Sequence, residues 1–220
     1  MKFFIDTANL DQIKEAQELG VLDGVTTNPS LMAKEGITGK KNILNHYSRI
    51  CDIVDGDVSA EVISTDLKGI IEEGEELAKL HPQIVVKVPM ITEGVKAIRY
   101  FSNKSIKTNC TLIFSVGQAL IAAKAGATYI SPFIGRLDDI STDGLNLISE
   151  IVTVFDNYGF STQILAASIR HTMHIIDCAK IGADVMTGPL SAIKGLLNHP
   201  LTDIGLAKFL ADHKKGNWWL

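Results

Sequence analysis

A single lysine interrupts one of the most apolar segments of the chain. Lys87 lies in the run IVVKVP at residues 84–89, with a valine on each side. Burial disfavours the charged form of a lysine, and a neutral amine is the nucleophile that attacks a ketone. A buried ammonium could instead be held in an interior ion pair, for which Asp6 and Glu61 are the candidate partners. Lys87 is therefore either a Schiff-base lysine or half of a structural ion pair, and this residue alone does not separate the two.

Two carboxylates are candidates for acid–base chemistry beside that amine. Asp6 and Glu61 each lie in a short segment that we predict to be a strand, and a carboxyl group near an amine in a dry site can be tuned towards neutral pH. Asp6 could alternatively cap the helix that follows it, because the segment DTAN at 6–9 suits an N-cap. A capping role fits Glu61 poorly, because we expect another strand residue to follow it.

Polar side chains recur near the C-terminal ends of the predicted strands. Strands of a parallel barrel are covered on both faces, so they should be almost wholly apolar. Side chains alternate along a strand, so polar residues two apart share one face. Because the C-terminal strand ends form the floor of the active site in barrel enzymes, a ring of polar groups at that level predicts a site. The ring consists of Asp6, Thr26, Asn28, Ser59, Glu61, Lys87, Asn109, Thr111, Ser131 and Ser168, with Phe133 following Ser131 on the same face.

Two arginines follow the sixth and seventh predicted strands and could bind an anion. Arg136 comes shortly after Ser131, and Arg170 lies two residues after Ser168. A planar guanidinium can donate two hydrogen bonds to one phosphate, and backbone N–H groups at the start of a helix also favour anions. Loops after the seventh strand often hold phosphate in barrel enzymes. The pattern favours a phosphate site, although either arginine taken alone is better explained as a solvated surface charge.

These residues require a scaffold that brings many strand ends to one place. Short apolar runs alternate with longer amphipathic stretches along the chain, in about eight strand–helix units. That number closes a parallel barrel, whereas a doubly wound open sheet usually needs fewer units. The predicted strands are 3–7, 24–27, 58–63, 84–89, 107–112, 129–133, 163–167 and 184–187. The predicted helices are 10–19, 41–53, 66–80, 92–103, 115–125, 144–158, 172–181, 190–197 and, at the end, about 203–213.

The predicted fold is a single (β/α)8 TIM barrel of the α/β class with an extra C-terminal helix. The length of 220 residues suits one domain, and no segment resembles a linker, so we predict one domain over residues 1–220. Hydrophobic residues make up 46% of the chain and charged residues 21%, which is ordinary for a globular protein with a core.

Composition and motifs argue against several classes of partner. The formal net charge is −4, so we expect no nucleic acid, and an anionic substrate would need a local positive cluster. No apolar run reaches the roughly 18 residues of a membrane span, and Asp6 comes too early for a signal peptide. The three cysteines form no CxxC pair, which favours reduced thiols in a cytoplasmic protein. His171 and His174 share a helix face without an evident third ligand, and no Walker or GxGxxG motif is present, so we expect neither a metal nor a nucleotide.

Six segments of the chain together resemble the transaldolase family. Each motif alone has little specificity, but the set covers nearly the whole chain in the family's order. The length matches the small subfamily, which also contains the fructose-6-phosphate aldolases. The segments are DTA at 6–8, GVTTNPS at 24–30, VVKVP at 85–89, NCTLIFS at 109–115, SPFIGR at 131–136 and AASIR at 166–170.

The resemblance implies a class I aldolase-type enzyme of the pentose phosphate pathway that needs no cofactor. Its substrates would be sugar phosphates: a dihydroxyacetone unit would pass from sedoheptulose 7-phosphate to glyceraldehyde 3-phosphate, giving erythrose 4-phosphate and fructose 6-phosphate. Lys87 would form the Schiff base, and Asp6 would take the C4 hydroxyl proton as the C3–C4 bond breaks. Glu61 and Thr111 would hold a catalytic water for proton transfer at the imine. A protonated imine is an electron sink, so it stabilises the carbanion that cleavage would otherwise leave.

The remaining residues carried over by the resemblance would bind substrate rather than react with it. Those expected around the dihydroxyacetone unit are Asn28, Asn109 and Ser131, and Thr26 and Phe133 are also expected to bind substrate. Those expected around the phosphate are Arg136, Ser168 and Arg170.

Three functions stay open: a transferase, a lyase of the fructose-6-phosphate aldolase type, and a barrel that binds a sugar phosphate without turning it over. Intact Lys87, Asp6 and Glu61 count against the third. In the aldolases, the positions of Glu61 and Phe133 are typically Gln and Tyr, so this sequence follows the transaldolase pattern. A tyrosine hydroxyl could protonate the bound enamine and release free dihydroxyacetone, whereas Phe133 has no proton to give.

The C-terminal run GNWWL at residues 216–220 carries large apolar side chains that a monomer would leave exposed. A neighbouring subunit is a good candidate to cover them, and the chain's own barrel is the alternative. The resemblance implies a homo-oligomer, namely a decamer built from two five-membered rings.

Overall fold

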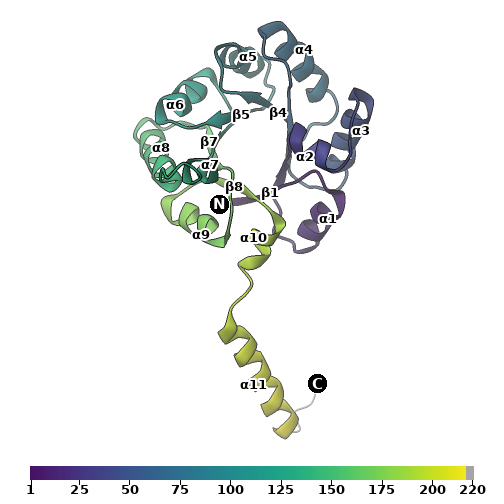
Figure 1. Ribbon diagram of the computed structural model, residues 1–220, viewed down its shortest axis with the longest axis vertical. Helices are drawn as coiled ribbons and strands as arrows, with labels where there is room; N and C mark the ends of the chain where they lie inside the picture. The colour runs from purple at the N-terminus through teal and green to yellow at the C-terminus, as the bar shows by residue number, and fades with distance from the viewer. Residues whose placement is uncertain (217–220) are drawn as a thin grey trace.

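The eight predicted strands form a closed parallel barrel. The computed structural model describes residues 1–216. Its strands are β1 Lys2–Asp6, β2 Gly24–Thr26, β3 Asp57–Glu61, β4 Ile84–Pro89, β5 Thr108–Ile113, β6 Tyr129–Pro132, β7 Gln163–Ala166 and β8 Val185–Gly188. Each strand pairs with the next, and β8 pairs with β1 to close the ring (Figure 1). The predicted (β/α)8 TIM barrel is thereby confirmed, with strand ends that differ from the prediction by no more than a few residues.

Helices surround the barrel, because each parallel connection must cross back over the outer face of the sheet (Figure 1). The helices around the barrel are α1 Leu10–Glu18, α3 Lys40–Cys51, α4 Leu67–Ala78, α5 Thr92–Asn103, α6 Val116–Ala125, α8 Gly144–Tyr158, α9 Thr172–Ile181 and α10 Leu190–Gly195. Outward-facing strand residues such as Ile5, Val25, Val58 and Val86 are fully buried against them. This layer of apolar contacts is the larger of the two cores of the protein.

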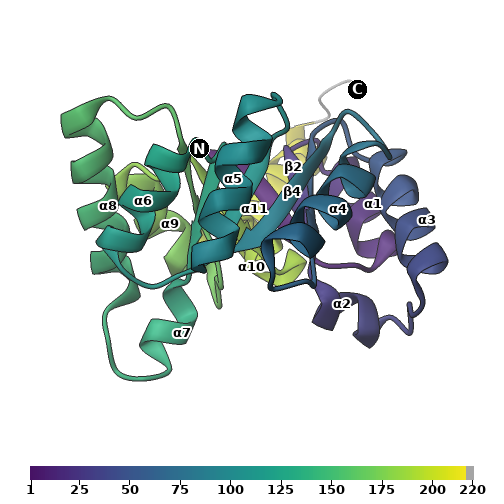
Figure 2. The same ribbon diagram turned by 90° about the horizontal axis from the view of Figure 1, so that it is seen from above.

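Two short helices lie beyond the ends of the main helices, at the same end of the barrel. They are α2 Pro29–Lys34, which follows β2, and α7 Ile134–Asp138, which follows β6. Figure 2 shows both of them at that end. Neither helix is among the predicted ones, because five or six residues are too few to display a period of 3.6.

The interior of the barrel has an apolar layer and a polar layer. The apolar layer is a core cluster of its own, against which Phe133 packs; its members are Phe4, Val85, Tyr129, Leu165, Ala167 and Val185. Because strand side chains alternate, the residues two positions later face the same interior nearer the C-terminal ends. In four strands these residues are polar: Asp6, Lys87, Ser131 and Thr187.

Gly24 shows how closely the apolar layer is packed. A Cβ at this position would lie 2.5 Å from the ring of Phe4 and 2.6 Å from the backbone oxygen of Asp57. Phe4 in turn meets Tyr129 edge-on, with ring centroids 6.0 Å apart. Only glycine therefore fits beside the Phe4 ring, and the N-terminal half of the barrel is filled with side chains, as in other TIM barrels.

The last helix stands apart from the barrel. Helix α11 runs from Pro200 to Gly216, longer at both ends than the predicted 203–213, and Figure 1 shows it extending away from the other elements. None of its residues is buried. Large apolar side chains are exposed along it, among them Leu201, Ile204 and Phe209. Of the run GNWWL, residues 217–220 lie outside the described part of the chain, so their predicted burial is untested. None of the helices within residues 1–216 is long and apolar enough to cross a membrane.

Candidate active site

A cavity of about 510 Å³ opens at the C-terminal ends of the strands. That volume is typical of small-molecule sites, which occupy about 300–1,000 Å³. Ten of the twelve predicted site residues line it: Asp6, Thr26, Asn28, Glu61, Lys87, Thr111, Ser131, Phe133, Arg136 and Ser168. Eight of the ten polar residues that were expected to form a ring at the strand ends therefore line one cavity, and Ser59 and Asn109 do not.

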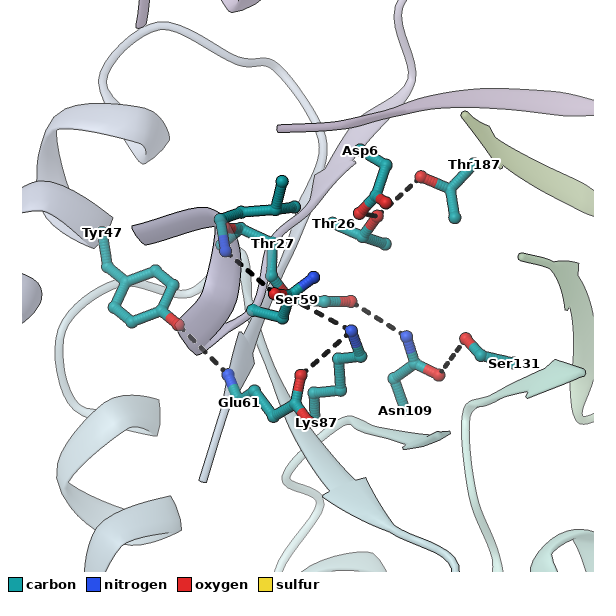
Figure 3. A network of polar contacts seen from close by, with 12 residues as sticks. Asp6, Thr26, Thr27, Tyr47, Ser59, Glu61, Lys87, Asn109, Ser131 and Thr187 are labelled. Carbon is teal, nitrogen blue, oxygen red and sulfur yellow. Dashed lines mark hydrogen bonds and ion pairs between the residues drawn. The ribbon is translucent and has the colours of Figure 1, made fainter. Parts of the chain in front are cut away.

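The amine of Lys87 lies at the wall of this cavity between two acceptors (Figure 3). Its Nζ lies 3.1 Å from Oε2 of Glu61 and donates to the backbone oxygen of Thr27 at 3.2 Å. Glu61 and Lys87 are direct partners in the pairing of β3 with β4, which explains why their side chains meet. Lys87 is only 6% exposed. The interior ion pair that the sequence left open is thus present, with Glu61 rather than Asp6, and it faces a cavity rather than a closed core.

The backbone of Glu61 is fixed by a hydrogen bond to a tyrosine. It is the last residue of β3, two residues before the predicted end of that strand, and its backbone N–H donates to Oη of Tyr47 at 3.2 Å. Burial raises the pKa of Tyr47 to about 12, so the phenol keeps its proton at neutral pH. The next helix is capped by Asp66, so Glu61 has no capping role, as predicted.

The carboxylate of Asp6 on β1 is joined by hydrogen bonds to the hydroxyl groups of one threonine on β2 and one on β8 (Figure 3). Oγ1 of Thr26 donates to Oδ1 of Asp6 at 2.8 Å and lies 2.6 Å from Oγ1 of Thr187. Because Thr26 has one hydroxyl proton and gives it to the carboxylate, Thr187 is the donor to Thr26. The alternative of a helix cap is wrong for Asp6, since Asn9 caps α1.

Asn109 lies beneath the cavity rather than on its wall. It is fully buried, and its amide joins two hydroxyl groups: Nδ2 donates to Oγ of Ser59 at 3.1 Å, and Oδ1 accepts from Oγ of Ser131 at 2.8 Å. Ser131 faces the cavity and Asn109 does not. In this arrangement Asn109 positions Ser131, which differs from the expectation that the amide itself meets the substrate.

The end of β5 is irregular where it reaches the cavity. Its pairing with β6 shifts register between Cys110 and Ile113, and Leu112 has a φ of 63°. That left-handed conformation costs a leucine about 1–3 kcal/mol, and such strain clusters at functional sites. Oγ1 of Thr111 is buried and has no hydrogen-bond partner among residues 1–216. The strand is thus irregular at the same point of the cavity wall where this unsatisfied hydroxyl lies.

Asn28 stands at the rim, where α2 begins. Its side-chain oxygen accepts from the backbone N–H of Leu31 at 3.0 Å and so caps that helix. The cap fixes the turn that carries residues 28–31 along one side of the cavity.

The three residues predicted to bind phosphate are divided between the cavity and its surroundings. Arg136 lines the cavity, with its guanidinium carbon 4.9 Å from the ring centroid of Phe133. Ser168 lines it too and has a φ of 60°. Arg170 does not: its Nη2 lies 2.6 Å from Oδ2 of Asp139. Two of the three predicted phosphate residues therefore meet at the cavity, while the third is paired with a carboxylate beside it.

Sequence reasoning missed several residues of the site. Thr187 had the same signal as the others, a polar residue near the end of an apolar strand, and could have been found. Leu112 and the backbone oxygen of Thr27 carry no such signal, because their roles depend on backbone geometry. Within residues 1–216, no group of three His, Cys, Asp or Glu side chains is placed to hold a metal ion.

The chain is similar to known proteins over nearly its whole length. Residues 3–217 match the family described as Transaldolase/Fructose-6-phosphate aldolase. A protein of Flavobacterium psychrophilum named probable transaldolase is 77% identical over 217 residues, covering 99% of this chain and all of that protein. Proteins of the same name from Cytophaga hutchinsonii and Phocaeicola vulgatus are 75% and 72% identical over the same coverage. Because the family match and these relatives cover nearly the whole chain, including every residue of the cavity, this chain belongs to the transaldolase/fructose-6-phosphate aldolase family.

Proposed function

We propose that the protein is a transaldolase of the pentose phosphate pathway. It transfers a dihydroxyacetone unit from sedoheptulose 7-phosphate to glyceraldehyde 3-phosphate through a Schiff base on Lys87. The single observation that carries this proposal is the buried amine at the cavity wall, 3.1 Å from the carboxylate of Glu61. The curated relatives described above bear the same name, which supports the transferase over other uses of the barrel.

The side chains of the cavity supply each step of that reaction. The amine of Lys87 adds to the C2 carbonyl of the ketose, and loss of water gives the protonated imine. Asp6 takes the proton of the C4 hydroxyl, the C3–C4 bond breaks, and its electron pair moves into the imine to form an enamine. The aldehyde product leaves, and the enamine attacks the carbonyl carbon of the acceptor aldehyde. The same steps run in reverse then release fructose 6-phosphate.

Glu61 and Thr111 are proposed to manage the protons at the imine. Glu61 contacts the amine, and the hydroxyl of Thr111 is unsatisfied within the described residues. Together they could hold the water that is lost and regained during imine formation and hydrolysis. Thr26, Asn28, Ser131 and Phe133 line the part of the cavity proposed for the dihydroxyacetone unit, with Asn109 supporting Ser131 from below.

The phosphate is proposed to bind at Arg136 and Ser168, on the side of the cavity formed by α7 and the loop after β7. Arg136 is exposed, and a guanidinium donates two hydrogen bonds to one phosphate. Arg170 is proposed as a third ligand, which requires it to exchange Asp139 for the phosphate.

Reductive trapping tests the covalent step. The protein is incubated with fructose 6-phosphate, reduced with borohydride, digested and examined by mass spectrometry. We expect an adduct of the size of reduced dihydroxyacetone on Lys87, and none without the sugar. If no adduct forms on Lys87, the covalent mechanism is wrong and a barrel that only binds sugar phosphates becomes the better explanation.

The competing lyase is tested by measuring two products side by side. Glu61 and Phe133 occupy the positions that are typically Gln and Tyr in the fructose-6-phosphate aldolases, so we expect transfer to an acceptor with little free dihydroxyacetone. Phe133 packs edge-on against Phe114 and presents only ring carbons to the cavity. If free dihydroxyacetone appears as fast as the unit is transferred, the aldolase function replaces the transaldolase.

A homo-oligomer in the cytoplasm is proposed with this function. The exposed apolar side chains of α11, such as Leu201, Ile204 and Phe209, are more than a single subunit usually leaves in water. By resemblance the assembly is a decamer of two five-membered rings. The three cysteines are free thiols and all are buried, which suits a reducing compartment. Sedimentation velocity at micromolar concentration is the test of assembly, and a monomer there would refute it.

A further inference from the structure

Helix α7 and the loop after β7 are joined by backbone hydrogen bonds where they border the cavity. The backbone N–H groups of Ile134 and Gly135 donate to the backbone oxygens of Ala167 and Ser168, both at 3.0 Å. The contact is close: a Cβ on Gly135 would lie 2.4 Å from the Ser168 oxygen. Arg136 lies on one of these segments and Ser168 on the other, so the distance between them depends on how these hydrogen bonds hold the two segments together.

A buried histidine forms a second link between the same segments through its two ring nitrogens. His174, in the first turn of α9, accepts from the backbone N–H of Arg170 through Nδ1 at 3.3 Å. Its other ring nitrogen, Nε2, lies 3.1 Å from Oδ2 of Asp138 at the end of α7. An Nδ1 that accepts is unprotonated, so the proton of the neutral ring is on Nε2 and is donated to the carboxylate. Both nitrogens of His174 are thus used, one for each segment.

The charges around the ring favour its neutral form. Burial lowers the pKa of His174 below its usual value, and the neighbouring His171, whose ring centroid is 3.9 Å away, lowers it further. Asp138 and Asp177 act in the opposite direction, and Arg170 adds to the lowering. The net direction is downward, so the ring is neutral at physiological pH and gains a proton only in acid.

We propose that His174 is a positioning residue for the phosphate side of the cavity, because its neutral ring ties Asp138 of α7 to the backbone of Arg170. This inference rests on the proposed function, since it concerns the residues that would bind the substrate's phosphate. When the ring gains a proton, Nδ1 becomes a donor that faces the N–H donor of Arg170, and that link is lost. Phosphate binding then weakens while the chemistry at Lys87 is unchanged.

The test measures anion binding at two pH values by calorimetry with inorganic sulfate. Sulfate keeps its double negative charge between about pH 5 and 8, so any change in affinity belongs to the protein. We expect the wild type to bind sulfate about fivefold or more weakly at low pH than at neutral pH, which is the effect of losing about one hydrogen bond. In His174→Asn, whose amide oxygen can accept from Arg170 but does not titrate, the affinity should be the same at both pH values.

Three further variants separate this role from simpler ones. His171→Asn should keep the pH dependence, because its ring is exposed and makes no bond to Arg170 or Asp138 among the described residues. Asp138→Asn should move the loss of affinity to lower pH, because the Asp138 carboxylate raises the pKa of His174. In steady-state assays, His174→Leu, which has neither an acceptor for Arg170 nor a donor for Asp138, should raise KM for fructose 6-phosphate with kcat nearly unchanged, whereas a general loss of folding would lower kcat.

Three results would overturn the inference. Equal sulfate affinity of the wild type at both pH values would mean that the ring does not control the site. Tighter binding in acid would mean that the added proton attracts the anion directly. A pH dependence that disappears in His171→Asn would assign the titration to that residue. Reductive trapping on Lys87 judges the proposed function independently of all three.

Discussion

The hydroxyl of Thr26 is the donor that holds Asp6, and its removal should slow the reaction. Valine has nearly the same shape but cannot donate to Oδ1 of Asp6, which Thr26 reaches at 2.8 Å. A hydrogen bond to a charged group contributes about 1.5–3 kcal/mol. If Asp6 needs that bond to be oriented in the transition state, kcat/KM of Thr26→Val should fall by about 10- to 150-fold, since each 1.36 kcal/mol is about tenfold.

The same substitution should also lower stability, for a separate reason. Thr187 donates to Thr26 across 2.6 Å and both residues are buried, so valine leaves the Thr187 hydroxyl proton without its acceptor. An unsatisfied buried donor costs about 1–3 kcal/mol. For a chain of this size that corresponds to a fall in Tm of roughly 2–12 °C, which differential scanning fluorimetry can measure.

Two matched variants separate these effects. Thr26→Ser keeps the hydroxyl and should retain most of kcat/KM in a coupled assay of transfer. Thr187→Val removes the donor itself and leaves the bond from Thr26 to Asp6 intact, so it should change activity and Tm less than Thr26→Val does. If Thr26→Val were as active as Thr26→Ser, the orientation of Asp6 would not depend on this bond and the reasoning would be refuted.

Three other substitutions test the site and the barrel. Lys87→Ala should lower turnover by several orders of magnitude, and activity above roughly a tenth of wild type would exclude it as the nucleophile. Phe133→Tyr should raise the release of free dihydroxyacetone from fructose 6-phosphate, because the phenol can protonate the enamine; an unchanged ratio of release to transfer would count against that role. Gly24→Ala should lower the free energy of unfolding by about 1–3 kcal/mol through its clashes with the ring of Phe4 and the backbone oxygen of Asp57, as denaturant titration would show, and an unchanged value would mean that both groups move aside at no cost.

Residues that break an apolar strand could be predicted from the sequence because burial makes them costly. Lys87 and Glu61 are unusual in strands that are covered on both faces, so the sequence predicted either an active site or an interior ion pair, and the barrel brings the two side chains to 3.1 Å. The strand count likewise predicted closure of the barrel, since a parallel crossover needs a helix each time. Asp6 was ambiguous because its segment also suited a cap, and only the geometry showed that Asn9 takes that role.

Residues whose roles depend on a neighbour could not be predicted in the same way. Asn109 shares the pattern of the ring, yet its amide is used by Ser59 and Ser131. Arg170 follows the seventh strand as expected, but its partner Asp139 lies in a turn that no periodicity predicts. His174 looked like one of two histidines on a helix face, and its link to Asp138 became visible only once α7 was placed.

The apolar layer beneath the site limits how two substrates can use it. Side chains such as Phe4, Val85 and Tyr129 fill the barrel from below, so within the described part of the chain the Lys87 amine is approached from the C-terminal mouth. The donor sugar and the acceptor aldehyde then enter through the same opening of the cavity. The aldehyde released from the donor has to leave before the acceptor aldehyde can reach the enamine. If Lys87 forms the proposed Schiff base, this order of events should give ping-pong kinetics, with parallel lines in double-reciprocal plots at several fixed acceptor concentrations. It also means that an excess of acceptor competes with the donor for the empty enzyme.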